Sequence, residues 1–261
     1  MARDESPPFD AMIPFHQKDS DILPYCIFGL RKNMRGLRNI YVVSREEPED
    51  LEDAIWISED RFPFTKADVE GIIKSTNNRH GWYLQQLLKL YAFHGIEGAL
   101  DHILVFDADC VVCRPIELFN EQGQILFDWT HEIIYEPYFK HATAALGDLF
   151  CRVNPSVSGI REHMLFRRDI LNGMLNKLEA RHADIPAWKA LLETVNPEEF
   201  NHSGMSEYEL YFNYALKWFS NEHALRSLKR GNGISIRALA EGAHQADIIV
   251  FHAWVIESCK S

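Results

Sequence analysis

The sequence lacks the features that mark membrane-spanning, secreted or repetitive proteins. Its longest apolar run, residues 248–256, is about half the length that a membrane helix needs, and it contains His252. Residues 1–8 include no apolar core, so we expect a flexible tail there, no secretory signal peptide and a cytoplasmic location. There is no internal repeat and no low-complexity tract. These absences predict a soluble globular chain without a membrane span.

The chain is also poor in positive charge. Its 261 residues include 27 Lys and Arg against 38 Asp and Glu, which gives a formal net charge of −11 at pH 7. A protein that neutralises the phosphates of a nucleic acid needs a basic face, so we expect no nucleic-acid partner.

Cysteine is scarce, with five residues, an odd number that we interpret as reduced thiols. Cys110 and Cys113 have the spacing of a metal or redox pair. No second pair follows them in the sequence, so packing within a strand is the preferred interpretation.

Apolar runs and helical patterns alternate along the first 110 residues. The predicted strands are 9–15, 39–43, 54–57 and 102–107, and the predicted helices are 20–33 and 81–94. The second half is less regular, with predicted strands 125–129, 132–135 and 247–252 and predicted helices 168–181, 187–195 and 207–219. Such alternation favours an α/β fold, a mostly parallel sheet with helices on both faces.

The most specific chemical feature is Asp107-Ala108-Asp109, which directly follows the apolar residues 103–106. The carboxyl ends of parallel strands face the ligand crevice of such a sheet. Two carboxylates one residue apart can both reach Mg²⁺ or Mn²⁺, which prefer oxygen ligands. A surface acid pair at a strand end is the alternative. An apolar strand that runs directly into the pair favours the metal.

Five segments carry a family resemblance, and they follow one another along nearly the whole chain. They resemble glycosyltransferases of the GT-A fold, in particular a bacterial and large-virus glycosyltransferase-like group. The segments are IPFHQKD at 13–19, GWYLQQLLKL at 81–90, VFDAD at 105–109, SEYEL at 206–210 and FH at 251–252.

The resemblance implies a single GT-A domain over residues 9–261, with a nucleotide-binding half at about 9–110 and an acceptor half at about 111–261. It implies Mn²⁺ or Mg²⁺ as the cofactor, held by Asp107 and Asp109, with Asp107 and Ala108 beside the donor. The expected donor is a UDP-sugar, galactose or glucose by analogy with other Mn²⁺-dependent GT-A enzymes. The expected acceptor is a sugar hydroxyl of a glycan or glycoconjugate.

A polar face on the predicted helix 81–94 is a candidate donor site. Trp82, Gln85 or Gln86, and Lys89 recur at helical spacing and share one side. Arg79 and Lys89 are the cations that we expect to meet the donor diphosphate. A solvated face on an amphipathic helix is the alternative.

The loop after the first strand contains Pro14, Phe15, His16 and Lys18. In the GT-A fold this loop holds the base and ribose of the nucleotide, so the resemblance assigns these residues to the donor. From the residues alone, a polar turn between strand and helix is the preferred interpretation.

Two histidines are further candidates. His252 ends an apolar strand, and the resemblance implies that it is the third metal ligand, because many GT-A enzymes use a late histidine. His163 is a candidate acceptor contact, or else a histidine with a structural role in a loop.

Glu207 and Glu209 follow Ser206 at the start of a predicted helix. Ser206 as N-cap and Glu209 three residues later form the pattern of a capping box, which explains Glu209 without any chemistry. Glu207 is not needed for the cap, and an inverting sugar transfer needs a carboxylate base. We therefore rank Glu207 above Glu209 as the catalytic base.

Two other functions are open to this sequence. In a haloacid-dehalogenase-like phosphatase, Asp107 would be the nucleophile and Asp109 the general acid. Those enzymes usually carry the motif on their first strand, and here about a hundred residues precede it. A catalytically silent nucleotide-sugar-binding module would keep the metal site and lack a working base.

Overall fold

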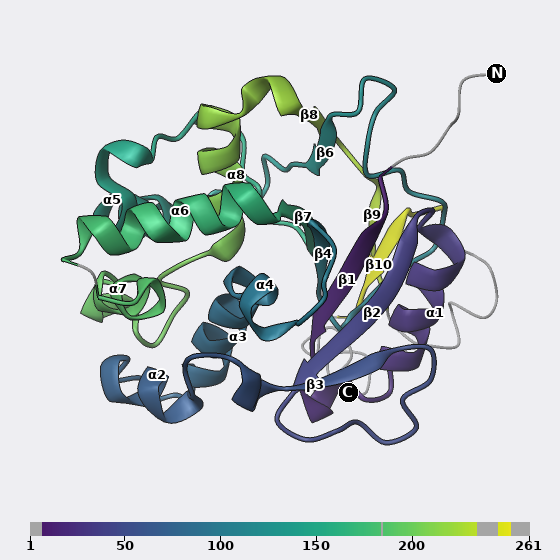
Figure 1. Ribbon diagram of the computed structural model, residues 1–261, viewed down its shortest axis with the longest axis horizontal. Coiled ribbons are helices and arrows are strands. Elements are labelled where there is room, and N and C mark those ends of the chain that lie inside the picture. The colour runs from purple at the N-terminus through teal and green to yellow at the C-terminus, as the bar shows by residue number, and fades with distance from the viewer. Residues whose placement is uncertain (1–6, 184, 234–244, 252–261) are drawn as a thin grey trace.

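A five-stranded sheet forms the centre of the computed structural model, which describes residues 7–183, 185–233 and 245–251 (Figure 1). Its order is β3-β2-β1-β4-β7, with β1 parallel to β2 and β4, β2 parallel to β3, and β7 antiparallel to β4. The strands are β1 (Phe9–Pro14), β2 (Leu37–Ser44), β3 (Ile55–Ser58), β4 (His102–Phe106) and β7 (His163–Arg167). The predicted α/β class with a mostly parallel sheet is confirmed.

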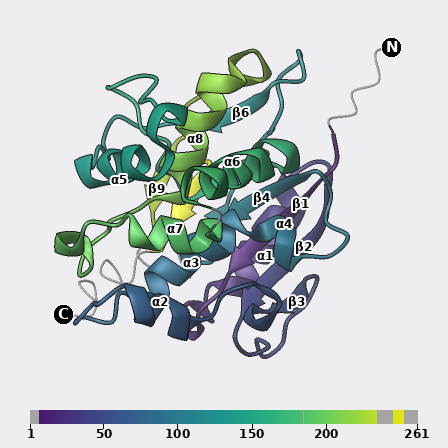
Figure 2. The same ribbon diagram turned by 60° about the vertical axis from the view of Figure 1, so that its left-hand side comes forward.

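Helices cover both faces of this sheet. In Figure 1, α1 lies on the opposite side of the sheet from α3 and α4, and α5 to α8 lie to the left of β4 and β7. Figure 2 shows α5 to α8 still grouped together after the turn. The helices are α1 (Leu23–Asn33), α2 (Lys66–Ile72), α3 (His80–Leu90), α4 (Ala92–Gly95), α5 (Glu136–Leu146), α6 (Arg168–Arg181), α7 (Ala187–Glu193) and α8 (Glu207–Trp218). None of the helices in the described ranges is long and apolar enough to cross a membrane.

Smaller elements complete the fold. One sheet has the order β5-β10-β9 and another pairs β6 with β8 in parallel. The strands are β5 (Cys110–Val112), β6 (Ile125–Asp128), β8 (His223–Arg226), β9 (Arg230–Asn232) and β10 (Ile248–Val250). The 3-10 turns are η1 (Gln17–Asp19), η2 (Glu59–Arg61), η3 (Gly147–Leu149), η4 (Pro197–Glu199) and η5 (Ser220–Glu222).

Several predicted boundaries are wrong. The predicted strand 132–135 is not a strand, and it leads into α5, whose first turn contains Pro137. The predicted helix 81–94 is divided at Tyr91, whose φ of −105° and ψ of 18° are not helical, into α3 and α4. Helix α1 begins at Leu23 rather than near residue 20, because a proline occupies its first turn.

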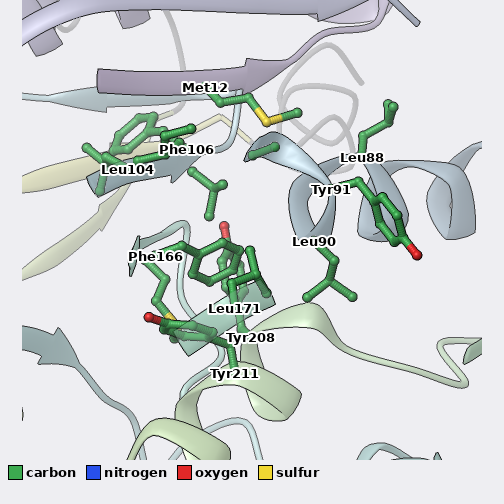
Figure 3. Close-up of a cluster of buried hydrophobic side chains, with 14 of the residues drawn as sticks. Met12, Leu88, Leu90, Tyr91, Leu104, Phe106, Phe166, Leu171, Tyr208 and Tyr211 are labelled. Carbon is green, nitrogen blue, oxygen red and sulfur yellow. The ribbon is translucent and has the colours of Figure 1, made fainter. Parts of the chain in front are cut away.

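Buried side chains from the strands and from α3 and α8 meet in one core. Figure 3 shows Met12, Leu104 and Phe106 from the sheet facing side chains of those helices. The helix and strand partners labelled there are Leu88, Leu90, Tyr91, Phe166, Leu171, Tyr208 and Tyr211. Because apolar burial holds α3 and α8 against β4, polar residues at their ends are brought close to the carboxyl end of that strand.

Candidate active site

Asp107 and Asp109 lie in a turn at the carboxyl end of β4, where the sequence placed them. Backbone hydrogen bonds hold this turn from two sides. The N–H of Asp107 donates to the carbonyl of Glu162 at 2.9 Å, and the N–H of Phe251 donates to the carbonyl of Asp109 at 2.8 Å. Both aspartates are partly exposed, whereas Ala108 between them is buried. The turn therefore presents two carboxylates at the edge where ligands bind in such sheets.

Lys89 lies behind this turn as a buried cation shared by two acids. Its Nζ is 2.6 Å from Oδ1 of Asp107 and 2.7 Å from Oε1 of Glu207, and it donates to the Tyr208 hydroxyl at 3.1 Å. The side chain of Lys89 is only 2% exposed. Burial by itself lowers the pKa of Lys89, but Asp107 and Glu207 more than offset this and raise it well above its usual value. Lys89 is therefore a permanent positive charge between the two carboxylates.

The electrostatics of the turn fit a divalent cation. Burial raises the pKa of Asp107 to about 7, Lys89 opposes this rise, and the like charge of Asp109 adds to it. A cation between Asp107 and Asp109 would relieve that repulsion. Mg²⁺ is commonly held by one or two carboxylates together with substrate phosphates, and these two aspartates match such a set.

A third metal ligand is not found in the part of the chain that the structure describes. Across these residues, no three His, Cys, Asp or Glu side chains come together in a way that could hold a metal. The predicted ligand His252 lies outside the described residues. The backbone N–H of Phe251, the residue before His252, donates a hydrogen bond to the carbonyl of Asp109.

Glu207 and Glu209 have different surroundings, although both are buried. The carboxylate of Glu209 accepts hydrogen bonds from the Ser158 hydroxyl and from Asn213, whose Nδ2 is 2.8 Å from Oε2. Ser206 accepts from the N–H of Glu209 at 3.2 Å, so the predicted N-cap is present. In a full capping box the Glu209 side chain would also accept a hydrogen bond from the N–H of Ser206. In the structure it accepts from Ser158 and Asn213 instead. Of the two acids, Glu207 is the one beside Asp107.

The polar face of α3 is mostly not solvated. Gln86 is buried, and its Oε1 accepts from the N–H of Glu207 at 3.4 Å, while Trp82 and Gln85 are half-buried. Arg79 lies at the start of α3, ten positions before Lys89, which corresponds to about 15 Å along a helix axis. The backbone positions of the two cations are therefore separated, and their assignment to the donor diphosphate stays a prediction.

The loop after β1 approaches the aspartate turn. Pro14 and Phe15 are buried, whereas His16 and Lys18 are exposed, and His16 accepts from the N–H of Lys18 at 3.2 Å as the cap of η1. Burial raises the pKa of Asp19 to about 6, with Lys18 lowering it and Asp109 raising it further. Asp19 is a residue that the sequence interpretation did not assign, although it ends the matching segment 13–19.

His163 lies inside the central sheet. It belongs to β7, is in register with Phe106 of β4, and is 3% exposed. Burial, reinforced by Arg226 and Arg161, lowers the pKa of His163 to about 3. The ring is therefore neutral and has little surface with which to touch an acceptor.

The chain belongs to a family of unknown function (DUF6492), whose model matches residues 32–240. No curated protein matches the sequence. The crystal structure of mouse xyloside xylosyltransferase 1 in its apo form is similar at 12% identity and a TM-score of 0.48, over 95% of this chain and 98% of that one. Similarity of this degree transfers neither an activity nor a substrate to the chain.

Proposed function

We propose that the protein is a metal-dependent glycosyltransferase that moves a hexose from a UDP-sugar to a hydroxyl of a glycan acceptor. The observation that carries this proposal is the turn with Asp107 and Asp109 at the carboxyl end of β4, held from behind by the Lys89–Glu207 ion pair. The turn lies in one of the five segments that resemble GT-A enzymes, and three of the others supply its neighbours α3, α8 and the loop after β1.

In this proposal, Asp107 and Asp109, with His252 from the sequence, hold Mn²⁺ or Mg²⁺. The cation would neutralise the negative charge that develops on the departing nucleoside diphosphate. Lys89 favours the charged form of Asp107 and holds its carboxylate in place, which prepares the turn for the cation. The exposed His16 and Lys18 at η1 are placed to meet the nucleoside part of the donor, since η1 lies near Asp109.

Glu207 is the candidate base on the sequence argument, and its surroundings add a second task. Its ion pair with Lys89 places it beside Asp107, although its side chain is only 3% exposed, so an acceptor hydroxyl would reach it only after a local rearrangement. Through Lys89 it also positions Asp107. Glu209 is assigned a structural role, because its carboxylate is engaged by Ser158 and Asn213.

A donor screen tests the proposal. The full chain is incubated with Mn²⁺ or Mg²⁺ and with each of UDP-glucose, UDP-galactose and other nucleotide sugars, and free UDP is measured. The same donors are screened by thermal shift, where a donor at a hundredfold excess over its Kd should stabilise the protein by about 2.7 kcal/mol. Failure of every nucleotide sugar to bind and to release its nucleotide would overturn the proposal.

The two alternatives give different results in the same experiment. A haloacid-dehalogenase-like phosphatase would release phosphate from p-nitrophenyl phosphate and would ignore the donors. A silent binding module would show thermal stabilisation by a nucleotide sugar without release of UDP, with and without added glycan acceptors.

A further inference from the structure

A cavity opens at the start of α3, and its lining residues include neither Asp107 nor Asp109. Its volume is about 540 Å³, within the range of about 300–1,000 Å³ that small-molecule sites occupy. Its walls include Asn77, Arg79, Tyr135, Tyr138, Asn201 and Ser203. Of these residues, only Arg79 was assigned to the donor from the sequence.

Arg79 is held rigidly in the wall of this cavity. Its Nε donates to the carbonyl of His202 at 3.1 Å, its Nη2 donates to the Ser203 hydroxyl at 2.6 Å, and the guanidinium lies 4.7 Å from the centre of the Trp82 ring. A guanidinium fixed in this way loses little freedom when it binds an oxyanion such as a carboxylate or a phosphate. Among the residues that the structure describes, none of those that line the cavity carries a carboxylate. Glu199, which lies close by, accepts from the Tyr135 hydroxyl at 2.8 Å.

The remaining walls suit a sugar ring. Tyr135 is 36% exposed and packs edge-on against Tyr138, with ring centres 5.1 Å apart. An exposed aromatic ring beside amide and hydroxyl groups offers an apolar surface and hydrogen bonds together, as the two sides of a sugar require. The rim is stiff, because Asn77 donates to the carbonyl of Asn201 at 2.8 Å, and Asn201 accepts from the N–H of Thr76 at 2.7 Å.

The cavity and the aspartate turn are joined through the start of α8. Ser203 lies in the cavity wall three residues before Ser206, the N-cap of the helix that carries Glu207. Glu207 also contributes to the raised pKa of Tyr138, so the two groups are near enough to interact. Arg79 and Lys89 are about 15 Å apart along the axis of α3, and they have different partners in the structure.

We propose that this cavity binds an acidic sugar, with Arg79 holding its carboxylate or phosphate and Tyr135 lying against its ring. That the acidic sugar is part of the acceptor, at a distance from the reacting hydroxyl, rests on the proposed glycosyltransferase function. Binding of the acidic sugar itself does not.

The test measures binding of glucuronic acid, glucose 6-phosphate and neutral glucose to the full chain by ligand-observed NMR. We expect at least one of the two acids to bind ten or more times more tightly than glucose, and the pair shows whether carboxylate or phosphate is preferred. Arg79→Ala should remove that preference, and Tyr135→Leu should weaken binding of acid and glucose alike. Arg61→Ala, which removes an exposed arginine paired with Glu97, is the matched control and should change nothing.

Equal binding of glucose and both acids, or an unchanged preference in Arg79→Ala, would overturn the proposal. Displacement of the acids by UDP would also overturn it, because the cavity would then belong to the donor. Melting curves of Arg79→Ala and Tyr135→Leu show whether each variant is folded. If the unchanged protein binds an acidic sugar but neither binds nor uses any nucleotide sugar, this site stands and the glycosyltransferase function is overturned. Sugar transfer without binding of either acidic sugar would support the glycosyltransferase function and overturn the proposed acid-binding site.

Discussion

Lys89 and Glu207 are 118 positions apart in the sequence and form a buried ion pair, with Nζ 2.7 Å from Oε1. Their side chains are 2% and 3% exposed. The pair joins α3 to α8 directly behind Asp107, so the stability of the fold and the arrangement of the candidate site depend on the same contact. Removing one partner leaves a charge in a region from which water is excluded.

Lys89→Met should destabilise the protein by about 3–5 kcal/mol, because the buried Glu207 and the partly exposed Asp107 both lose their counter-charge. The free energy of unfolding from urea titration measures this. Lys66→Met is the control, since Lys66 and Glu70 are half-exposed, and it should cost less than about 0.5 kcal/mol. Adding Glu207→Gln to Lys89→Met should recover part of the loss. Equal costs for the two lysine variants would contradict this prediction.

Asp109→Asn should abolish Mn²⁺-dependent binding of the donor and leave the melting temperature without ligand nearly unchanged. The side chain is partly exposed and supplies ligand charge rather than packing. Thermal shift with UDP, with and without Mn²⁺, is the measurement. Asp101→Asn, at a side chain that is 81% exposed beside Arg168, is the matched control. If Asp109→Asn still turned over at the normal rate, the metal assignment would be wrong.

Glu207→Gln should lower the rate of transfer roughly a hundredfold to ten-thousandfold if Glu207 is the base, with donor binding retained. The amide also weakens the contact with Lys89, so we expect a loss of about 1–3 kcal/mol in stability. Glu209→Gln is the companion variant and should keep most of the transfer rate. The kcat, the KM for the acceptor and the pH profile are measured for both. Loss of transfer in Glu209→Gln alone would show that the two roles are reversed.

Glu209 should make the protein less stable as the pH rises from about 4.5 to about 7. Burial raises the pKa of this carboxyl to about 7 in the folded state, above its ordinary 4.5, although Ser158 and Asn213 donate to it. The folded state therefore holds a proton that the unfolded state loses over this range, and the free energy of unfolding falls. Glu209→Gln should remove this slope, which is on the order of 2 kcal/mol across the range. Unfolding titrations at pH 5, 6 and 7 measure it, and parallel curves for the two proteins would contradict the prediction.

Two helical glycines should respond in opposite ways to alanine. A Cβ on Gly29 in α1 would lie 2.8 Å from the carbonyl oxygen of Val112, a backbone atom that cannot swing aside, so Gly29→Ala should cost about 1–3 kcal/mol. A Cβ on Gly173 in α6 would meet nothing within 4 Å, so Gly173→Ala should stabilise by about 0.5–1 kcal/mol. Urea midpoints of the two variants provide the comparison. A gain in stability for Gly29→Ala would show that α1 can move away from β5.

Local patterns were sufficient for the central strands and for the position of the aspartate turn. Three apolar runs could be recognised as strands from their own residues, at 9–15, 39–43 and 102–107. Each of them corresponds to a strand in the structure. Acidic residues that directly follow a parallel strand lie at the carboxyl-terminal edge of the sheet, whichever position the strand has in it. Strand β7 was not predicted, because its identity as a strand comes from pairing with β4.

The sequence by itself determined which residue types are present, the alternation of strand and helix, and the motif that suggests a sugar transferase. The tertiary structure decided which polar groups are buried and what each one faces. The sequence predicted that Lys89 contacts a diphosphate, whereas in the structure Lys89 is buried between Asp107 and Glu207. The Glu209 side chain was predicted to accept a hydrogen bond from the N–H of Ser206, and instead it accepts from Ser158 and Asn213. Helical periodicity shows which side chains share a face. Whether that face meets water or another helix depends on segments more than a hundred residues away, and the burial they impose sets the charge and the hydrogen bonds of each group.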